Sequence, residues 1–195
     1  MFYNVQFNAF CIIFKNKSIC HKCFSEANPI LKDFKIQNVD AFAVYPYDEF
    51  IKSQLYQFKG CFDIELAPIF LDYYKTYLRF HYFNYVIVPA PSAFEADKER
   101  GFNHVVEMFK VLGLEIVPCI KKTANIKQSS LHAEERKNIK DYLSFNNEYN
   151  ITNKNILIVD DVLTTGSTLN AIINLIKKHH PKKIQVLVMS MVVPK

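Results

Sequence analysis

Two adjacent acids followed by a run of small hydroxyl side chains carry the clearest chemistry in this sequence. Asp160 and Asp161 come directly after the apolar run 156–159, which is typical of a buried strand. Carboxylates accept hydrogen bonds from sugar hydroxyls, or bind a cation that bridges to a polyphosphate. An amphipathic helix is expected next, and the residues between the acids and this helix include Thr164, Thr165, Gly166, Ser167 and Thr168.

The start of this helix suits a phosphate, because its first N–H groups are unpaired and the helix dipole is positive there. Helix capping alone would explain one or two polar residues, but seven of the nine residues in 160–168 are polar or small. The stretch lacks the Gly-x-x-x-x-Gly-Lys pattern of a P-loop, and a dinucleotide fingerprint needs more than the single Gly166. We therefore predict a sugar-phosphate site at 160–168.

A second polar stretch follows the expected strand 86–88. Ala90, Pro91 and Ser92 can form a loop that presents backbone N–H groups to a pyrophosphate. Arg100 lies shortly after and is a natural partner for phosphate oxygens. Taken singly, Arg100 is typical of a surface residue and the prolines of a stiff turn.

The polar segment 121–147 is long for a connection inside a compact α/β domain, so it is either a functional lid or disordered. Judged only by its charged residues, this segment would be a solvent-exposed hairpin without a function in binding. The residues that a lid would bring to a ligand are Lys121, Lys122, Gln128 and Arg136.

Composition agrees with a small enzyme-sized domain. The chain has 195 residues, half of them hydrophobic, so we expect one core with a small appendage. A formal charge of +5 permits an anionic ligand or nucleic acid. No apolar run approaches a membrane span, and the N-terminal stretch lacks the features of a signal peptide. The chain has five cysteines and no feature of a secreted protein, which indicates a protein of the reducing cytosol.

Alternating strand-like and helix-like stretches from residue 85 onward indicate the α/β class, with a mostly parallel, doubly wound sheet and helices on both faces. The strands expected in this part are 86–88, 114–120, 156–159 and 184–193. Before it we expect a strand at 41–45, a helix from Asp48 to Lys59, and a second helix over 66–77.

The N-terminal stretch contains three cysteines. Cys20 and Cys23 form a Cys-x-x-Cys pair and Cys11 precedes it, which is most of a structural zinc site. Such a site needs four ligands, and Asn8 stands where a second Cys-x-x-Cys would begin. Either His21 is the fourth ligand of Zn²⁺, or the site has lost its metal and the thiols fill a small core.

The run 159–168 resembles the phosphoribosyl-pyrophosphate (PRPP) motif of type I phosphoribosyltransferases. The resemblance implies a type I phosphoribosyltransferase-like fold, in which the paired acids hold the ribose hydroxyls and the following loop holds the 5′-phosphate. It implies Mg²⁺ bound together with PRPP, a pyrophosphate loop at 90–92 and a flexible catalytic lid at 121–147. No catalytic residue is assigned.

The order of motifs over nearly the whole chain resembles the ComF/ComFC family of bacterial competence proteins. These motifs are the Cys-x-x-Cys pair, Phe-Lys-Gly at 58–60, Pro-Ala-Pro-Ser at 89–92, Arg-Gly-Phe-Asn at 100–103, Gln128, Leu131, Arg136, Asn138 and the PRPP motif. The resemblance implies a zinc-ribbon-like module at 1–34 joined to a phosphoribosyltransferase-like domain at 35–195. It further implies a role in natural transformation, in the cytoplasm and at the inner face of the membrane during DNA uptake.

Three functions remain open on the sequence. The chain is a phosphoribosyltransferase with an unknown acceptor, a module that handles single-stranded DNA, or a non-catalytic PRPP-binding regulator. Under the second function, lysines of the lid and of 179–183 would bind single-stranded DNA. The other partners would be proteins of DNA uptake or recombination. A regulator would need a DNA-binding domain, and no helix-turn-helix is evident.

Overall fold

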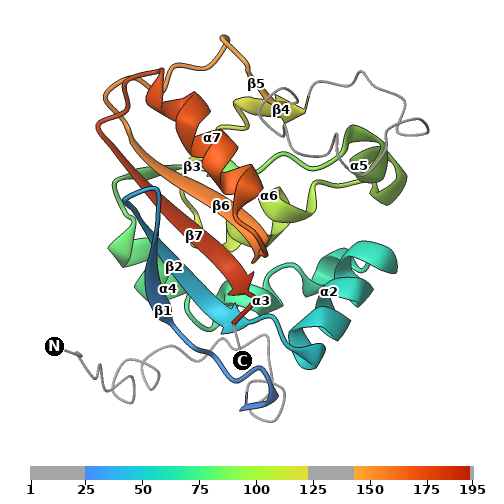
Figure 1. The fold of residues 1–195 in the computed structure, drawn as a ribbon. Helices are drawn as coiled ribbons and strands as arrows, with labels where there is room; N and C mark the ends of the chain where they lie inside the picture. Colours follow the sequence, from blue (N-terminus) through green and yellow to red (C-terminus); the bar gives the residue numbers. More distant parts are fainter. Residues whose placement is uncertain (1–24, 123–142, 194–195) are drawn as a thin grey trace, which may run out of the picture.

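A mostly parallel five-stranded sheet forms the centre of the molecule. The computed structural model describes residues 25–122 and 143–193. The strand order is β1-β2-β7-β6-β3, in which β1 and β2 are antiparallel and every other neighbouring pair is parallel. Figure 1 shows the sheet in this order. The strands are β1 Lys32–Ile36, β2 Val39–Pro46, β3 Tyr85–Pro89, β6 Asn155–Leu163 and β7 Lys183–Met191.

Helices cover both faces of this sheet (Figure 1). Helix α7, Ser167–Lys177, covers one face, and the other helices pack against the opposite face. These are α2 Glu49–Gly60, α3 Ile69–Asp72, α4 Lys75–His81 and α6 His104–Phe109, with α5 Phe94–Arg100 beside the end of β3 and short 3₁₀ turns at Ile64–Leu66 and Lys110–Leu112. None of the described helices is long and apolar enough to cross a membrane.

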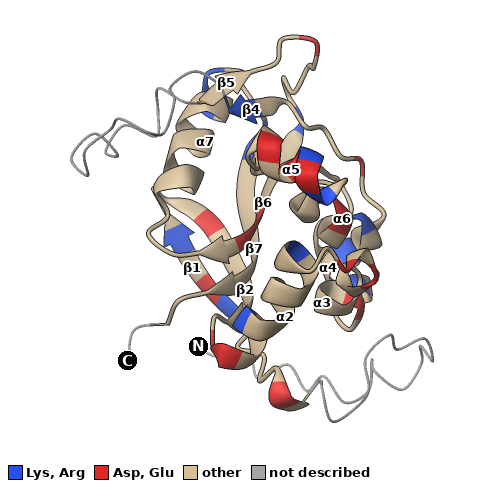
Figure 2. Cartoon of the chain, turned by 90° about the vertical axis from the view of Figure 1, so that its right-hand side faces the viewer, with Lys and Arg blue, Asp and Glu red and all other residues tan. Residues whose placement is uncertain are grey.

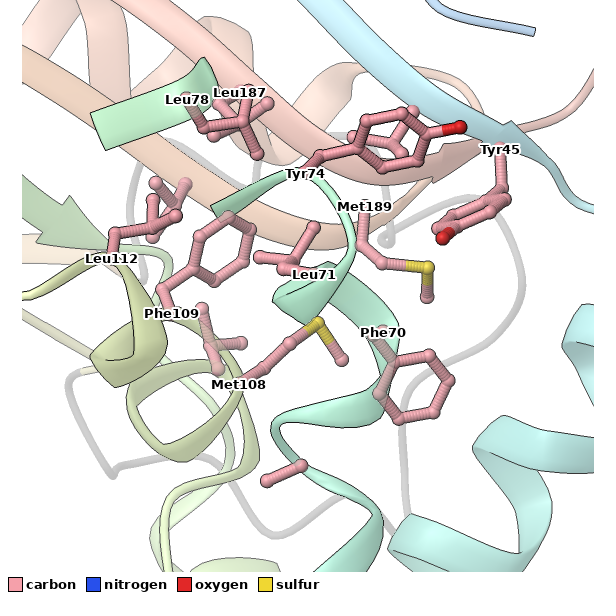
Figure 3. Close-up of a cluster of buried hydrophobic side chains, with 14 of the residues drawn as sticks. Tyr45, Phe70, Leu71, Tyr74, Leu78, Met108, Phe109, Leu112, Leu187 and Met189 are labelled. Atoms are coloured by element: carbon pink, nitrogen blue, oxygen red, sulfur yellow. The ribbon is translucent and has the colours of Figure 1, made fainter. Parts of the chain in front are cut away.

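The apolar run of β6 is buried on both sides because it lies between the two layers of helices. Ile156 and Ile158 face the α7 side, and Leu157 and Val159 face the α2–α4 side, since alternate strand residues point to opposite faces. All four are fully buried. The α2–α4 side also contains an aromatic and sulfur-rich cluster that Figure 3 shows around Leu71, with Phe70, Tyr74, Met108, Phe109, Leu187 and Met189.

Two predicted elements differ in the structure. The predicted strand 114–120 is wrong: this stretch makes a single parallel bridge, Ile87 to Ile116, and β4 begins only at Ile120. The Ile87 N–H donates to the Glu115 carbonyl and the Val117 N–H to the Ile87 carbonyl, but the next donor on β3 would be Pro89, which has no N–H, so the ladder stops there. Strand β4, Ile120–Lys122, instead pairs antiparallel with β5, Leu143–Phe145, in a separate two-stranded sheet.

The continuous helix predicted over 66–77 is also wrong, because α3 ends at Asp72 and α4 begins at Lys75. The break lets Tyr74 turn into the core, where its ring packs edge-on against Tyr45 at 6.2 Å between centroids. Strand β1 was not predicted, and the expected domain boundary after residue 34 falls within it.

We predict that Leu157→Ala lowers the free energy of unfolding by about 2–5 kcal/mol, because it leaves a cavity at a fully buried position of the central strand β6. Urea unfolding followed by circular dichroism measures this loss. Tyr56→Ala, at a side chain that is 69% exposed, is the control and should change stability little. Equal losses in the two variants would contradict the assignment of β6 to the core.

Candidate functional site

The two acids lie within β6, because this strand continues to Leu163 rather than ending at Val159. Asp160 accepts a hydrogen bond from the Asp161 backbone N–H at 2.9 Å through its Oδ1. Asp161 accepts one from the Val162 N–H at 2.7 Å, also through Oδ1. The hydroxyl of Ser190 on β7 donates to the backbone carbonyl of Asp161 at 3.2 Å. The backbone around the acids is therefore fixed from both strands.

The second oxygen of Asp161 is held by two residues from other elements. The ammonium group of Lys59, in the last turn of α2, forms an ion pair with Asp161 Oδ2. His104, the first residue of α6, places its Nε2 3.2 Å from the same oxygen. The Asp161 and His104 side chains are only about a tenth exposed, so this carboxylate is neutralised by protein groups rather than by water.

Arg100 determines which nitrogen of His104 carries the proton. Its Nη1 lies 3.0 Å from His104 Nδ1, and a guanidinium can only donate. Nδ1 must therefore accept, the proton is on Nε2, and Nε2 donates to Asp161. Arg100 also donates to Asp97 Oδ1 at 3.1 Å and to the carbonyl of Lys59 at 3.3 Å. Arg100 thus joins the end of α2 to α5 and α6.

The two neighbouring acids have opposite pKa shifts. Burial raises the pKa of the Asp160 carboxyl well above its usual value, and the charge of Asp161 adds to this rise. Burial would also raise the pKa of Asp161, but the hydrogen bond from His104 and the charge of Lys59 outweigh it and hold that pKa well below its usual value. Asp161 is therefore the ionised member of the pair.

A cavity of about 340 Å³ lies beside the two acids, and most of the predicted anion-binding stretches contribute residues to its wall. Its wall contains both acids, Thr168 from the start of α7, Ala90, Pro91 and Ser92 from the loop after β3, Arg100, and Lys122 from β4. Lys59 and His104 complete the polar part of the wall. Parallel strands end at the same edge of a sheet, which is why stretches far apart in sequence meet there.

Thr168 is the member of the hydroxyl loop that lines the cavity, whereas Thr164, Thr165 and Ser167 are exposed. The Thr165 and Ser167 hydroxyls lie 2.9 Å apart. Gly166 is the N-cap of α7 with φ +74°, a left-handed conformation that favours glycine. The Ser167 N–H donates to Thr165 Oγ1 at 3.4 Å. Because the glycine cap has no side-chain oxygen, the next N–H groups of α7, at Thr168 and Leu169, remain available to an anion.

The loop after β3 is fixed by a residue that the sequence did not assign to the site. Asn103 caps α6 by accepting from the Val106 N–H at 2.9 Å, and its Nδ2 donates to Ser92 Oγ at 3.1 Å and to Asp97 Oδ2 at 2.9 Å. The Ala90 N–H donates to the carbonyl of Val159 at 2.8 Å. These hydrogen bonds fix the position of the loop after β3 relative to β6 and α6.

Lys59 and His104 were likewise not predicted as site residues. Lys59 is 102 residues from Asp161, so no local spacing connects them. The sequence pointed to them only indirectly. Lys59 lies within the stretch 58–60 and His104 directly follows the stretch 100–103, and both stretches contributed to the family resemblance. A lysine directly before a glycine at a helix end was the available clue.

Several predicted residues lie outside the part of the chain that the structure describes. These are the lid residues Gln128 and Arg136 and the zinc candidates Cys11, Cys20, His21 and Cys23. Zinc binding therefore stays a prediction. Within residues 25–122 and 143–193, no group of three or more His, Cys, Asp or Glu could hold a metal ion. Of the described lid residues, Lys122 lines the cavity and Lys121 does not.

We predict opposite stability changes for substitutions of the two acids. In an experiment without added ligand, Asp160→Asn should stabilise the protein at pH 7.5, because a carboxyl with a raised pKa costs stability when ionised. The gain should vanish as the pH falls towards about 3.9, the usual Asp pKa. Asp161→Asn should lose about 1–3 kcal/mol at pH 7.5, because it leaves Lys59 without its carboxylate.

Urea unfolding at pH 7.5 and pH 4 measures both effects, with Asp63→Asn, at an exposed acid, as the control. The contribution of Asp161 should be present above the usual Asp pKa and decline as the pH falls, because its own pKa is lowered. A loss of stability in Asp160→Asn at pH 7.5 would contradict the assigned shift.

Comparisons with known proteins agree with this geometry. Residues 99–190 match the phosphoribosyl transferase domain. The chain is 27% identical over 144 residues to the competence protein ComFC of Streptococcus pneumoniae, covering 73% of this chain and 64% of that protein. It thus spans less than two thirds of that relative's length. It is also 47% identical over 36 residues to the hypoxanthine-guanine phosphoribosyltransferase of Bos taurus, covering 18% of this chain and 16% of that enzyme.

Among solved structures, a hypoxanthine phosphoribosyltransferase from Staphylococcus aureus matches with a TM-score of 0.43 and 12% identity, over 66% of this chain and 74% of that one. A phosphoribosylpyrophosphate synthetase from Mycobacterium smegmatis matches with a TM-score of 0.36 and 18% identity, over 62% of this chain and 33% of that one. The domain match and the mostly parallel sheet support the expected type I phosphoribosyltransferase fold. These matches support the resemblance stated from the sequence: the chain is similar to the competence protein ComFC, and part of it matches a phosphoribosyl transferase domain.

Proposed function

We propose that this protein binds PRPP together with Mg²⁺ in the cavity at the end of β6. The observation that carries the proposal is the meeting, in one cavity, of an acid pair, a glycine-capped helix start and three basic side chains. The basic residues are Lys59, Arg100 and Lys122. A ligand with a sugar between two phosphate-bearing ends matches this arrangement better than a simple anion, which the acids would repel.

Each group of the ligand has a candidate partner in the wall. The start of α7 and Thr168 would hold the 5′-phosphate, and the acids would accept hydrogen bonds from the ribose hydroxyls. The loop 90–92 and the basic residues would face the pyrophosphate.

The acids also fit the magnesium ion that the fold family implies. Mg²⁺ prefers oxygen ligands and is often bound by one or two carboxylates together with substrate phosphates. Asp160 and Asp161 supply carboxylates of this kind beside the cavity. When bound, the ion would neutralise part of the pyrophosphate charge.

The corresponding reaction is a transfer of the phosphoribosyl group. The bond between the anomeric carbon and the pyrophosphate oxygen would break as the nucleophile of an acceptor forms a new bond to that carbon. The acids would orient the ribose, and Lys122 and Arg100 would stabilise the negative charge on the departing pyrophosphate. The nature of the acceptor is left open in this proposal.

We predict that the double substitution Asp160→Asn with Asp161→Asn abolishes PRPP binding, because it removes both acceptors for the ribose and both ligands for the ion. Isothermal titration of PRPP in the presence of Mg²⁺ measures the affinity, and circular dichroism verifies folding. The control is Asp33→Asn with Asp63→Asn, which makes the same charge change at two exposed acids. Unchanged affinity in the site variant would refute the assignment.

A second candidate function is weak, sequence-independent binding of single-stranded DNA. The relative from S. pneumoniae is named a competence protein, and one contact favours a DNA-binding face on this chain. Phe145 of β5 stacks on His179, just after α7, with 3.6 Å between ring centroids. This contact brings β4, with Lys121 and Lys122, towards the basic segment 178–183. Figure 2 marks basic residues in blue on the ribbon of β4.

We predict that Lys182→Glu with Lys183→Glu weakens binding of a labelled oligonucleotide and flattens its dependence on salt, because phosphate contacts release counterions. Adding Lys121→Glu and Lys122→Glu should weaken it further. Fluorescence anisotropy between low and physiological salt measures both quantities. Lys35→Glu with Lys52→Glu, at lysines outside this face, is the control of equal charge. Parallel losses in the two double variants would indicate a general charge effect and not a DNA-binding face.

A further inference from the structure

The side chain of Lys59 pairs with Asp161, although the backbone of Lys59 is fixed elsewhere. Its carbonyl accepts from Arg100 Nε at 3.3 Å, and the residue lies in the last turn of α2. Only the flexible side chain reaches across to Asp161 Oδ2. Because the side chain is 32% exposed and lines the cavity, its ammonium group can move without any change in the helix.

The cavity offers few other mobile positive charges for a pyrophosphate. Arg100 is only 9% exposed at its side chain, and it is already engaged with Asp97, His104 and the backbone of α2. Its guanidinium also lies over the ring of Phe102 at 5.6 Å. Arg100 can therefore stabilise a pyrophosphate only from its fixed position, whereas Lys59, like Lys122, carries its charge on a flexible side chain in the cavity wall.

Asp161 would not be left unpaired if Lys59 moved away. It would keep the hydrogen bonds from His104 Nε2 at 3.2 Å and from the Val162 N–H at 2.7 Å. Arg100 fixes the His104 tautomer, so the imidazole continues to donate to the carboxylate. A buried charge left without compensation is costly, so Lys59 can leave only when a cation or hydroxyl of the ligand takes its place beside Asp161.

We propose that Lys59 is an exchangeable counterion: it neutralises Asp161 before a ligand binds and passes to the pyrophosphate of the arriving ligand. Asp161 Oδ2 then becomes available to a ribose hydroxyl or a divalent cation. This inference rests on the proposed function and adds a residue of α2 to the pyrophosphate-binding side of the cavity. It also implies that a divalent cation alone must compete with Lys59, so cation and PRPP bind better together than separately.

Lys59→Met tests the exchange because it should move two affinities in opposite directions. Binding of Mn²⁺ alone, measured by electron paramagnetic resonance, should tighten about tenfold, because the carboxylate loses its internal cation. Affinity for PRPP with Mg²⁺, measured by titration calorimetry, should weaken about tenfold, because the pyrophosphate loses a positive partner. Lys122→Met is the matched control: it lines the same cavity without pairing with Asp161, so it should weaken PRPP binding and leave Mn²⁺ affinity unchanged.

The outcomes separate this inference from the proposed function. If the unaltered protein binds PRPP and Lys59→Met changes neither affinity, or weakens both, the exchange is wrong and the proposed function stands. If the unaltered protein does not bind PRPP, the proposed function itself fails and the transfer to pyrophosphate fails with it. A tighter Mn²⁺ site in Lys59→Met would then still identify Lys59 as the internal counterion of Asp161. Urea unfolding of both variants verifies that the fold is retained.

Discussion

The charged carboxylate of Asp161, buried at the end of the central strand, is the constraint on which the rest of the site depends. A carboxylate taken out of water needs a counterion and several hydrogen bonds. Here the counterion comes from the end of α2, one donor from the start of α6, and another from the backbone of β6. Arg100 then ties the two helices together. Neutralising one side chain therefore dictates where three distant elements meet.

The sequence predicted well the elements whose pattern is local. The apolar run of β6, the amphipathic α7 and the Asp48 cap of α2 each depend on neighbouring residues, and all three are present. The failures arose where tertiary packing overrode periodicity. The helical spacing over 66–77 continued through Tyr74, but the core takes this ring by breaking the helix.

The candidate site divides in the same way. The acid pair and the hydroxyl loop form one continuous motif, so the sequence placed them next to each other and before a helix. The roles of Lys59, Asn103 and His104 come from partners elsewhere in the fold, and residue type alone did not distinguish them from a surface lysine, a helix cap and a core histidine. Arg100 was expected to contact phosphate, yet it donates hydrogen bonds to other protein groups because it lies where α2, α5 and α6 converge.

The hairpin of β4 and β5 affects how proteins related to this one can vary. Lys122 pairs with Leu143, so the two ends of the segment 123–142 start from adjacent strands, about 5 Å apart. The stacked rings of Phe145 and His179 attach this stem to the end of α7. Closing a loop between fixed neighbouring ends costs only about 0.6 kcal/mol more for each doubling of its length. The segment between β4 and β5 can therefore be exchanged during evolution without disturbing the central sheet, because the paired strands hold its two ends in place.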